Sequence, residues 1–102
     1  MFAMQIERHR ATAHAAGRAL LVTFGASWCT PCRAIAPALA AATRAPPAPV
    51  LLEVDVDRCQ DDVGVCSVPT LKLYRVGVAA PVMHVGASGL DEWMRDNVTD
   101  PA

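Results

Sequence analysis

Two cysteines separated by two residues are the part of the sequence best suited to chemistry. Cys29 and Cys32 lie in the stretch Trp28–Arg33, after an apolar segment and at the start of an alanine-rich one. Disulfide exchange requires a thiolate, and a free cysteine with a pKa of about 8.5 is mostly a thiol at neutral pH. The unpaired N–H groups and the dipole at a helix N-terminus stabilise the anion. This spacing at a helix start therefore predicts a redox-active dithiol.

The flanking segments are of the kind that would hold the pair in that position. Leu20–Phe24 is apolar and contains β-branched and aromatic residues, which favours a buried strand. Arg33–Ala45 is rich in helix formers, and its first residue adds a positive charge near the cysteines. Pro31 suits a first helical turn, where N–H groups have no helical partner. We therefore expect Cys29 to be exposed at or just before that turn, and Cys32 to lie one turn inside.

Two other interpretations of the pair, a zinc site and a structural disulfide, are weaker. Zinc would need further ligands, but Cys59 and Cys66 are seven residues apart, which is not a usual zinc spacing. The histidines His9, His14 and His84 are scattered along the chain. Closing so short a loop adds little stability, which argues against a merely structural disulfide. The sequence therefore predicts no metal site.

The sequence resembles the thioredoxin family over nearly its whole length. The resemblance rests on Phe24–Cys32 with its Trp-Cys-Thr-Pro-Cys motif, Ile35–Pro37, Val54–Asp57, Ser67–Thr70 and Val85–Ala87. It implies an α/β thioredoxin fold, with a central mixed β-sheet flanked by helices, formed by residues 1–102 as a single domain. Because only Met1–Gln5 are available before the first helix, the first strand of the family should be short or absent.

The resemblance also implies a dithiol–disulfide oxidoreductase that reduces protein disulfides. Cys29 would attack a substrate disulfide to form a mixed disulfide, and the more buried Cys32 would resolve it. No prosthetic group is expected, and electrons would come from NADPH through a thioredoxin reductase. Residues between the cysteines tune the reduction potential, and Thr30 stands where the family more often has glycine. An oxidant or isomerase, and a binding module with idle cysteines, remain alternatives.

A proline far from the cysteines in sequence is expected to complete the site. The resemblance implies that the Val68–Pro69 bond is cis and lies against the cysteines, and cis bonds are almost confined to X-Pro. Trp28, Val68, Gly86 and Ala87 would form a flat apolar surface around the nucleophile. Disulfide-containing substrate proteins would dock on this surface.

One departure from the family bears on proton transfer. Thr23 stands where the family commonly has a buried aspartate, and a threonine cannot ionise to act as a general base. Glu53 stands where the family often has a lysine. We hypothesise that Glu53 is partly buried, which favours its protonated form, and that it accepts the proton of Cys32 directly or through water. The alternative is that Glu53 is a solvated edge residue.

The remaining cysteines, Cys59 and Cys66, have two interpretations. Buried structural thiols are common in proteins. A second, regulatory disulfide is the alternative, because the segment from Asp57 to Pro69 is shorter than in the family by roughly one helical turn.

The other elements follow from hydrophobic patterning and turn residues. Residues 5–16 favour a helix with Gly17 as its C-cap, and residues 50–56 favour a strand close to a sheet edge. Residues 68–75 and 78–85 should pair, with Pro81 marking an edge strand or a bulge.

The last helix is expected to begin at Ser88, which with Asp91 resembles a capping arrangement. Its buried stripe should consist of Leu90, Trp93, Met94 and Val98, and residues 99–102 should fray.

Composition limits the classes of partner. The chain has 102 residues, 53% of them hydrophobic, and a net charge of −1, which is typical of one soluble globular domain without a basic excess for nucleic acid. The sequence shows no basic region followed by an apolar leader, and no apolar run of membrane-spanning length. We therefore expect a cytoplasmic monomer with neither nucleic-acid nor membrane partners.

Overall fold

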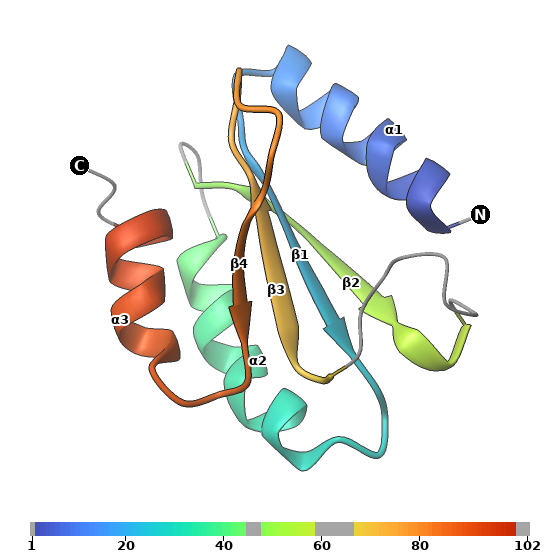
Figure 1. Cartoon of the computed structure of the whole chain (residues 1–102). Coiled ribbons are helices and arrows are strands. Elements are labelled where there is room, and N and C mark those ends of the chain that lie inside the picture. Colours follow the sequence, from blue (N-terminus) through green and yellow to red (C-terminus); the bar gives the residue numbers. More distant parts are fainter. Residues whose placement is uncertain (1, 45–47, 59–66, 100–102) are drawn as a thin grey trace.

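One mixed sheet of four strands forms the centre of the molecule. The computed structural model describes residues 2–44, 48–58 and 67–99. The strands are β1 (Leu20–Gly25), β2 (Val50–Asp55), β3 (Thr70–Tyr74) and β4 (Val82–Val85). They lie in the order β2-β1-β3-β4, with β1 parallel to β2 and the other pairs antiparallel (Figure 1). The predicted mixed sheet is therefore confirmed.

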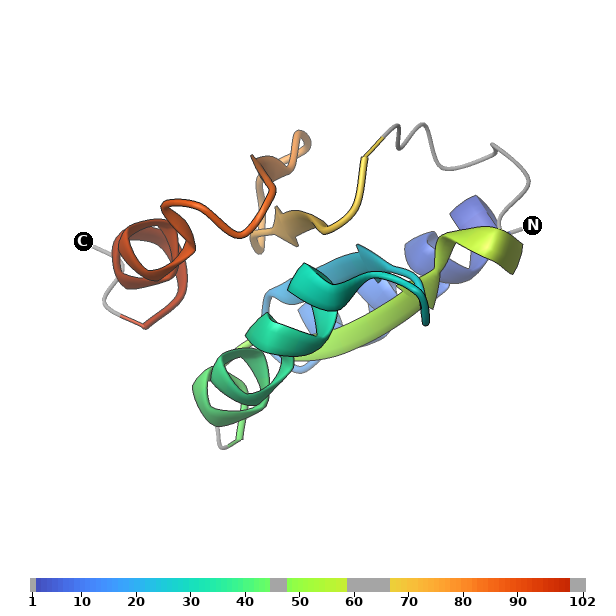
Figure 2. The ribbon, with the colours of Figure 1, turned by 90° about the horizontal axis from the view of Figure 1, so that it is seen from below.

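Helices cover both faces of this sheet. α1 (Phe2–Ala15) packs on one face. α2 (Thr30–Ala42) and α3 (Leu90–Met94), which continues into the π-helical η2 (Arg95–Thr99), lie side by side on the other face (Figure 2). A 3₁₀ turn, η1 (Val56–Arg58), follows β2. The chain passes from the end of β1 into α2, so the start of this helix is fixed by a strand whose residues are mostly buried.

Two apolar cores follow from the alternation of side chains along β1. Leu20, Val22 and Phe24 face α1 and are fully buried, while Leu21 faces α2 and α3. The α2 and α3 core also contains Ile35, Leu39, Leu90, Met94 and Val98. The predicted stripe of the last helix is therefore confirmed, with Trp93 packed at its margin.

The strand that begins the fold in the related family is absent from the described residues. Helix α1 starts at Phe2, so β2 has β1 as its only described neighbour and forms an edge of the sheet. The charged side chain of Glu53 is exposed there, and charged residues on an edge strand discourage further pairing. α1 ends where Gly17 adopts a φ of +75° and donates its N–H to the carbonyl of His14, in agreement with the predicted C-cap.

Several predicted boundaries in the second half are wrong. β3 starts at Thr70 rather than residue 68, since Pro69 has no N–H to donate to a ladder. β4 starts at Val82 rather than residue 78, because Pro81 has no N–H to donate to a ladder. The last helix starts at Leu90 after Gly89, whose φ is +74°, and no side chain caps it. The predicted capping by Ser88 is therefore wrong, and the Ser88 carbonyl instead contacts the His84 ring nitrogen Nε2 at 2.9 Å.

Candidate active site

The two cysteines form a disulfide at the start of α2. Cys29 is the N-cap residue, and its Sγ accepts a hydrogen bond from the backbone N–H of Cys32 at 3.2 Å. Pro31 lies in the first turn, where its missing N–H costs no helical bond. The predicted location of the pair at a helix start is confirmed, with Cys29 directly before the first residue of the helix, Thr30.

The exposure of the two cysteines is the reverse of the prediction. Cys29 is only 4% exposed, while Cys32 is half-buried. In the disulfide, the Cys29 sulfur is turned back onto the first turn of α2, where it meets the N–H of Cys32. Gly25 lies close to Cys32, because a Cβ at this position would lie 3.2 Å from Cys32 Sγ.

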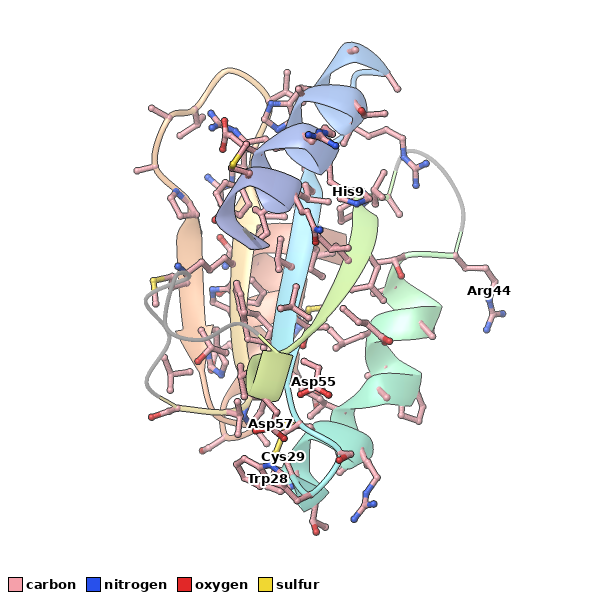
Figure 3. The ribbon with its side chains drawn as sticks, turned by 90° about the vertical axis from the view of Figure 1, so that its right-hand side faces the viewer. His9, Trp28, Cys29, Arg44, Asp55 and Asp57 are labelled. Atoms are coloured by element: carbon pink, nitrogen blue, oxygen red, sulfur yellow. A yellow bond between two sulfur atoms is a disulfide. The ribbon has the colours of Figure 1, made fainter. Side chains whose placement is uncertain are left out.

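Trp28 lies on the surface beside the disulfide and is fixed by a carboxylate. Its side chain is 63% exposed, and its Nε1–H donates to Asp57 Oδ2 at 2.9 Å. The backbone N–H of Asp57 in turn donates to Asp55 Oδ1 at 3.0 Å. Figure 3 shows all four residues, Trp28, Cys29, Asp55 and Asp57, gathered at one end of the sheet. An exposed aromatic ring held by a hydrogen bond is suited to contact a partner rather than to fill the core.

The Val68–Pro69 bond is cis, as the resemblance implied. Pro69 is buried just before β3, and the pairing of Thr70 with Phe24 in β1 brings it to the end of the sheet that carries the cysteines. The carbonyl of Pro69 accepts the N–H of Gly86 at 2.7 Å. Val68 and Gly86 are half-buried and Ala87 is exposed, so backbone at this end of the sheet remains partly accessible.

Comparison with known proteins agrees with this geometry. The family model named Thioredoxin matches residues 2–96. The chain belongs to the thioredoxin family. It is 40% identical to thioredoxin of Mus musculus over 70 residues, covering 66% of this chain and 67% of that one. It is 34% identical to a thioredoxin H-type of Oryza sativa over 90 residues, covering 72% and 74% of the two chains.

Solved thioredoxins share the fold. A thioredoxin h from poplar superposes with a TM-score of 0.74 at 26% identity, covering 90% of this chain and 85% of that one. A thioredoxin h from Nicotiana alata gives a TM-score of 0.68 at 25% identity. Membership of the thioredoxin family together with the Cys29–Cys32 disulfide makes the protein a dithiol–disulfide oxidoreductase whose redox group is the disulfide itself.

A cavity of about 370 Å³ lies beside the disulfide. It opens beside Cys32 between α2 and the ends of β1 and β2, and Thr23 and Glu53 both line it. These two residues are register partners across β1 and β2, so the structure does bring Glu53 to the position next to Thr23. Glu53 is exposed, however, so the expectation that it is partly buried is wrong. As the outermost strand, β2 has no neighbour among the described residues to cover that side chain.

Three contributors to the site were missed in the sequence. Asp57 was assigned only to a family motif, and its hydrogen bond to Trp28 was not predicted. Asp55, which is half-buried, lines the cavity together with Cys32 and pairs in register with Gly25. Gly25 directly after an aromatic residue, and immediately before the active-site loop, was the available signal for a cavity there.

The second cysteine pair, Cys59 and Cys66, lies outside the described residues, as does most of the shortened segment. His14 Nε2 lies 3.0 Å from the carbonyl of Tyr74, and His84 Nε2 lies 2.9 Å from the carbonyl of Ser88. Within residues 2–44, 48–58 and 67–99, no group of three or more histidine, cysteine or acidic side chains is arranged to hold a metal ion. No helix in those ranges is long and apolar enough to cross a membrane.

Proposed function

We propose that the protein reduces disulfides in other proteins, with Cys29 as the nucleophile and Cys32 as the resolving thiol. The observation that carries this proposal is the N-cap position of Cys29, whose sulfur accepts the N–H of Cys32. In the dithiol form, the same N–H and the helix dipole stabilise a thiolate on Cys29. Because the dithiol form has no S–S bond, the Cys29 sulfur is no longer held to Cys32 and can react with a substrate.

The reaction transfers two electrons in two exchange steps. The Cys29 thiolate attacks one sulfur of the substrate disulfide, and the other substrate sulfur leaves as a thiolate that takes up a proton. Cys32 then loses its proton and attacks Cys29 Sγ, which releases the second substrate sulfur as a thiolate. The substrate is reduced to two thiols, and the protein is oxidised to the Cys29–Cys32 disulfide that the structure contains.

The docking surface that we propose consists of Trp28, Val68, Gly86 and Ala87. Trp28 offers an exposed apolar ring held in place by Asp57, which lowers the entropy lost on binding. Val68 is half-buried and lies just before β3, where its backbone can pair with an extended segment of the substrate. Pro69, the next residue, offers no N–H to the thiolate.

Glu53 is the proton acceptor that we propose for Cys32, acting through water in the shared cavity. Support comes from its place in the cavity wall next to Thr23, and its exposure makes a water-mediated path the appropriate one. Replacement by glutamine should slow the resolution of the mixed disulfide near neutral pH. Asp55→Asn is the matched comparison, because Asp55 also lines the cavity. A resolution rate that Glu53→Gln leaves unchanged contradicts this role.

The source of electrons, the partners and the compartment are also proposals. We infer that electrons come from NADPH through a thioredoxin reductase and pass to disulfide-containing substrate proteins. A reductant of this type functions where glutathione and thioredoxin keep thiols reduced, and we therefore propose the cytoplasm. We further propose that residues 1–102 form one thioredoxin domain that functions as a monomer.

Single-turnover reduction of insulin disulfides by the pre-reduced protein tests the function. We expect Cys29→Ser to abolish the reaction, and Cys32→Ser to accumulate a mixed disulfide with insulin that mass spectrometry detects. A reduction potential near the value of about −270 mV found for thioredoxin supports a reductant, and one near about −120 mV identifies an oxidant instead. Thr30, exposed between the cysteines, is then the first residue to exchange for glycine. If the protein neither reduces nor oxidises insulin, the result supports the alternative of a binding module with idle cysteines.

A further inference from the structure

The loop from Gly86 to Gly89 carries part of the proposed docking surface and joins β4 to α3. Figure 1 shows this loop at the same end of the sheet as the start of α2. Both glycines have positive φ angles, +85° at Gly86 and +74° at Gly89. Glycine adopts such angles without strain, but it also has more alternative conformations than any other residue. Further contacts are therefore needed to keep the loop in one conformation.

Backbone hydrogen bonds hold the loop unevenly. Gly86 donates its N–H to the Pro69 carbonyl at 2.7 Å, which fixes the first residue to the sheet. Leu90 donates its N–H to the Ala87 carbonyl at 3.3 Å, which is long for a bond of this kind. Ala87 and Ser88 are both exposed. The middle of the loop is therefore held less firmly by the backbone than its first residue.

The side chain of His84, on β4, contacts the middle of the loop. Val82, two residues earlier, packs against the α2 and α3 core, so alternation along the strand places His84 on that face too. His84 Nε2 lies 2.9 Å from the carbonyl oxygen of Ser88. A carbonyl only accepts hydrogen bonds, so this contact requires a proton on Nε2. His84 therefore donates a hydrogen bond to the part of the loop that the backbone holds least firmly.

Trp93, on α3, holds the imidazole ring in place. The centroids of the His84 and Trp93 rings lie 5.7 Å apart and the ring planes are tilted by 38°, an arrangement typical of packed rings. Trp93 packs in turn against the α2 and α3 core. Its Nε1 is buried and has no hydrogen-bond partner among the described residues, so the indole contributes ring surface rather than a polar contact. The loop is thus connected to the core through one hydrogen bond and one pair of rings.

We propose that His84 is a positioning residue for protein substrates: its hydrogen bond to the Ser88 carbonyl keeps the loop in the conformation that meets the substrate. This inference rests on the proposed function and adds a residue that acts through the loop rather than on the sulfurs. A substrate that binds one loop conformation has an apparent affinity proportional to the population of that conformation. Loss of the hydrogen bond should therefore weaken docking and leave the exchange chemistry unchanged.

Single-turnover reduction of insulin by the pre-reduced full-length protein, over a range of insulin concentrations, tests this role. His84→Phe keeps a ring against Trp93 but has no donor for the carbonyl. It should raise the insulin concentration for half-maximal rate by about two- to tenfold, the range for one neutral hydrogen bond, with the limiting rate unchanged. His84→Gln, whose amide can donate to the carbonyl, should bring that concentration back to within about twofold of the original. Equal shifts in both variants, or no shift in His84→Phe, overturn the proposal.

Two controls separate docking from a general effect. Met83→Gln changes the exposed neighbour of His84 on the other face of β4, and it should alter neither the half-maximal concentration nor the limiting rate. The disulfide of 2-mercaptoethanol is too small to span the docking surface, so all variants should reduce it at the same rate. If His84→Phe slows this reaction as much as the insulin reaction, the proposal is overturned. His84→Leu, which is smaller and also lacks a donor, replaces His84→Phe if that variant does not fold.

Amide hydrogen exchange tests the loop directly, without a substrate. In the oxidised protein, His84→Phe should speed exchange of the Leu90 amide several-fold and leave that of Gly86, which donates to Pro69, unchanged. Unchanged exchange at Leu90 overturns the proposal. The two proposals fail in different ways. If the unsubstituted protein does not reduce insulin, the proposed reductase is rejected; if it does and His84→Phe has the same half-maximal concentration, only the positioning role is rejected.

Discussion

The two faces of β1 are built differently, although the same strand forms both. Toward α1, Leu20, Val22 and Phe24 are fully buried in an apolar core. Toward α2, the end of the strand carries Thr23 and Gly25, which line a cavity beside the disulfide. Close packing stabilises a fold, but it leaves no room for a reacting molecule. The comparison indicates that the α1 face of this strand is filled along its whole length, whereas the other face is filled at Leu21 and open only at the end beside the disulfide.

The largest effect on stability is expected on the α1 face of β1, where the side chains are fully buried. Phe24→Ala removes a fully buried aromatic side chain and should lower the free energy of unfolding by about 3–5 kcal/mol, because it leaves a cavity. Urea denaturation followed by circular dichroism measures this loss. Thr23→Ala, one residue away on the open face, is the matched control and should cost about 1 kcal/mol or less. Equal losses in the two variants contradict the proposed division between the faces.

The next effect concerns chemistry on the open face. Thr23→Asp introduces a carboxylate into the cavity that contains Cys32, and general base catalysis typically contributes 10²–10⁴-fold. Because a water-mediated path through Glu53 would already operate, we expect a gain of about tenfold in resolution of the mixed disulfide near neutral pH. Rapid acid quenching of a pre-formed peptide mixed disulfide measures the rate. Thr23→Asn, which has the same shape and cannot ionise, should show no gain.

A smaller effect should follow when the hydrogen bond between Trp28 and Asp57 is weakened. Asp57→Asn weakens the 2.9 Å hydrogen bond to an exposed indole, so stability should change by less than about 1 kcal/mol. The less constrained ring should raise the concentration of insulin needed for half-maximal rate, while the reaction with 2-mercaptoethanol stays unchanged. Asp91→Asn, an exposed aspartate on α3, is the control. Equal changes toward insulin and 2-mercaptoethanol would assign Asp57 to the disulfide rather than to docking.

The smallest effect tests how well the α1 face is closed. Burial, with a further contribution from the negative charge of Glu7, raises the pKa of Tyr74, the single tyrosine of the chain. A raised pKa in the folded state contributes stability below the ordinary tyrosine value of about 10, and this stability is lost as the pH rises through the folded-state pKa. The unfolding free energy should therefore fall in alkaline solution above that value. Tyr74→Phe should remove this part of the fall, and an identical pH profile in the variant contradicts it.

The sequence was sufficient for features that depend on residue type and spacing. It predicted the pair at a helix start, the cis bond before Pro69 and the missing first strand. The position of the pair follows from a local property, the CxxC spacing between a strand and a helix. The cis bond and the missing strand were implied by the resemblance to the family, applied to an X-Pro bond and to the few residues before α1. The mixed sheet followed from the resemblance that those residues carry.

Features that depend on what surrounds a residue were predicted less well. The order of burial of Cys29 and Cys32 was reversed, because burial depends on tertiary surroundings, such as the end of β1 beside Cys32, that spacing does not reveal. The exposure of Glu53 depends on the open edge of β2. The tether between Trp28 and Asp57 joins residues 29 positions apart, and spacing alone did not identify it.

The edge position of β2 also determines how its backbone amides exchange with solvent. The N–H of Val50 donates to the carbonyl of Ala19, on the β1 side of the strand. Because N–H groups alternate in direction along a strand of a parallel ladder, those of Leu51 and Glu53 point away from β1. On that side the sheet has no described strand. Amide protons of Leu51 and Glu53 should therefore exchange much faster than those of β1, which is paired on both sides. The cavity wall that carries the carboxylates is thus a strand hydrogen-bonded along one side only. Its local opening costs less free energy than opening of β1, so the width of the entrance to Cys32 can vary while the core beneath it stays folded.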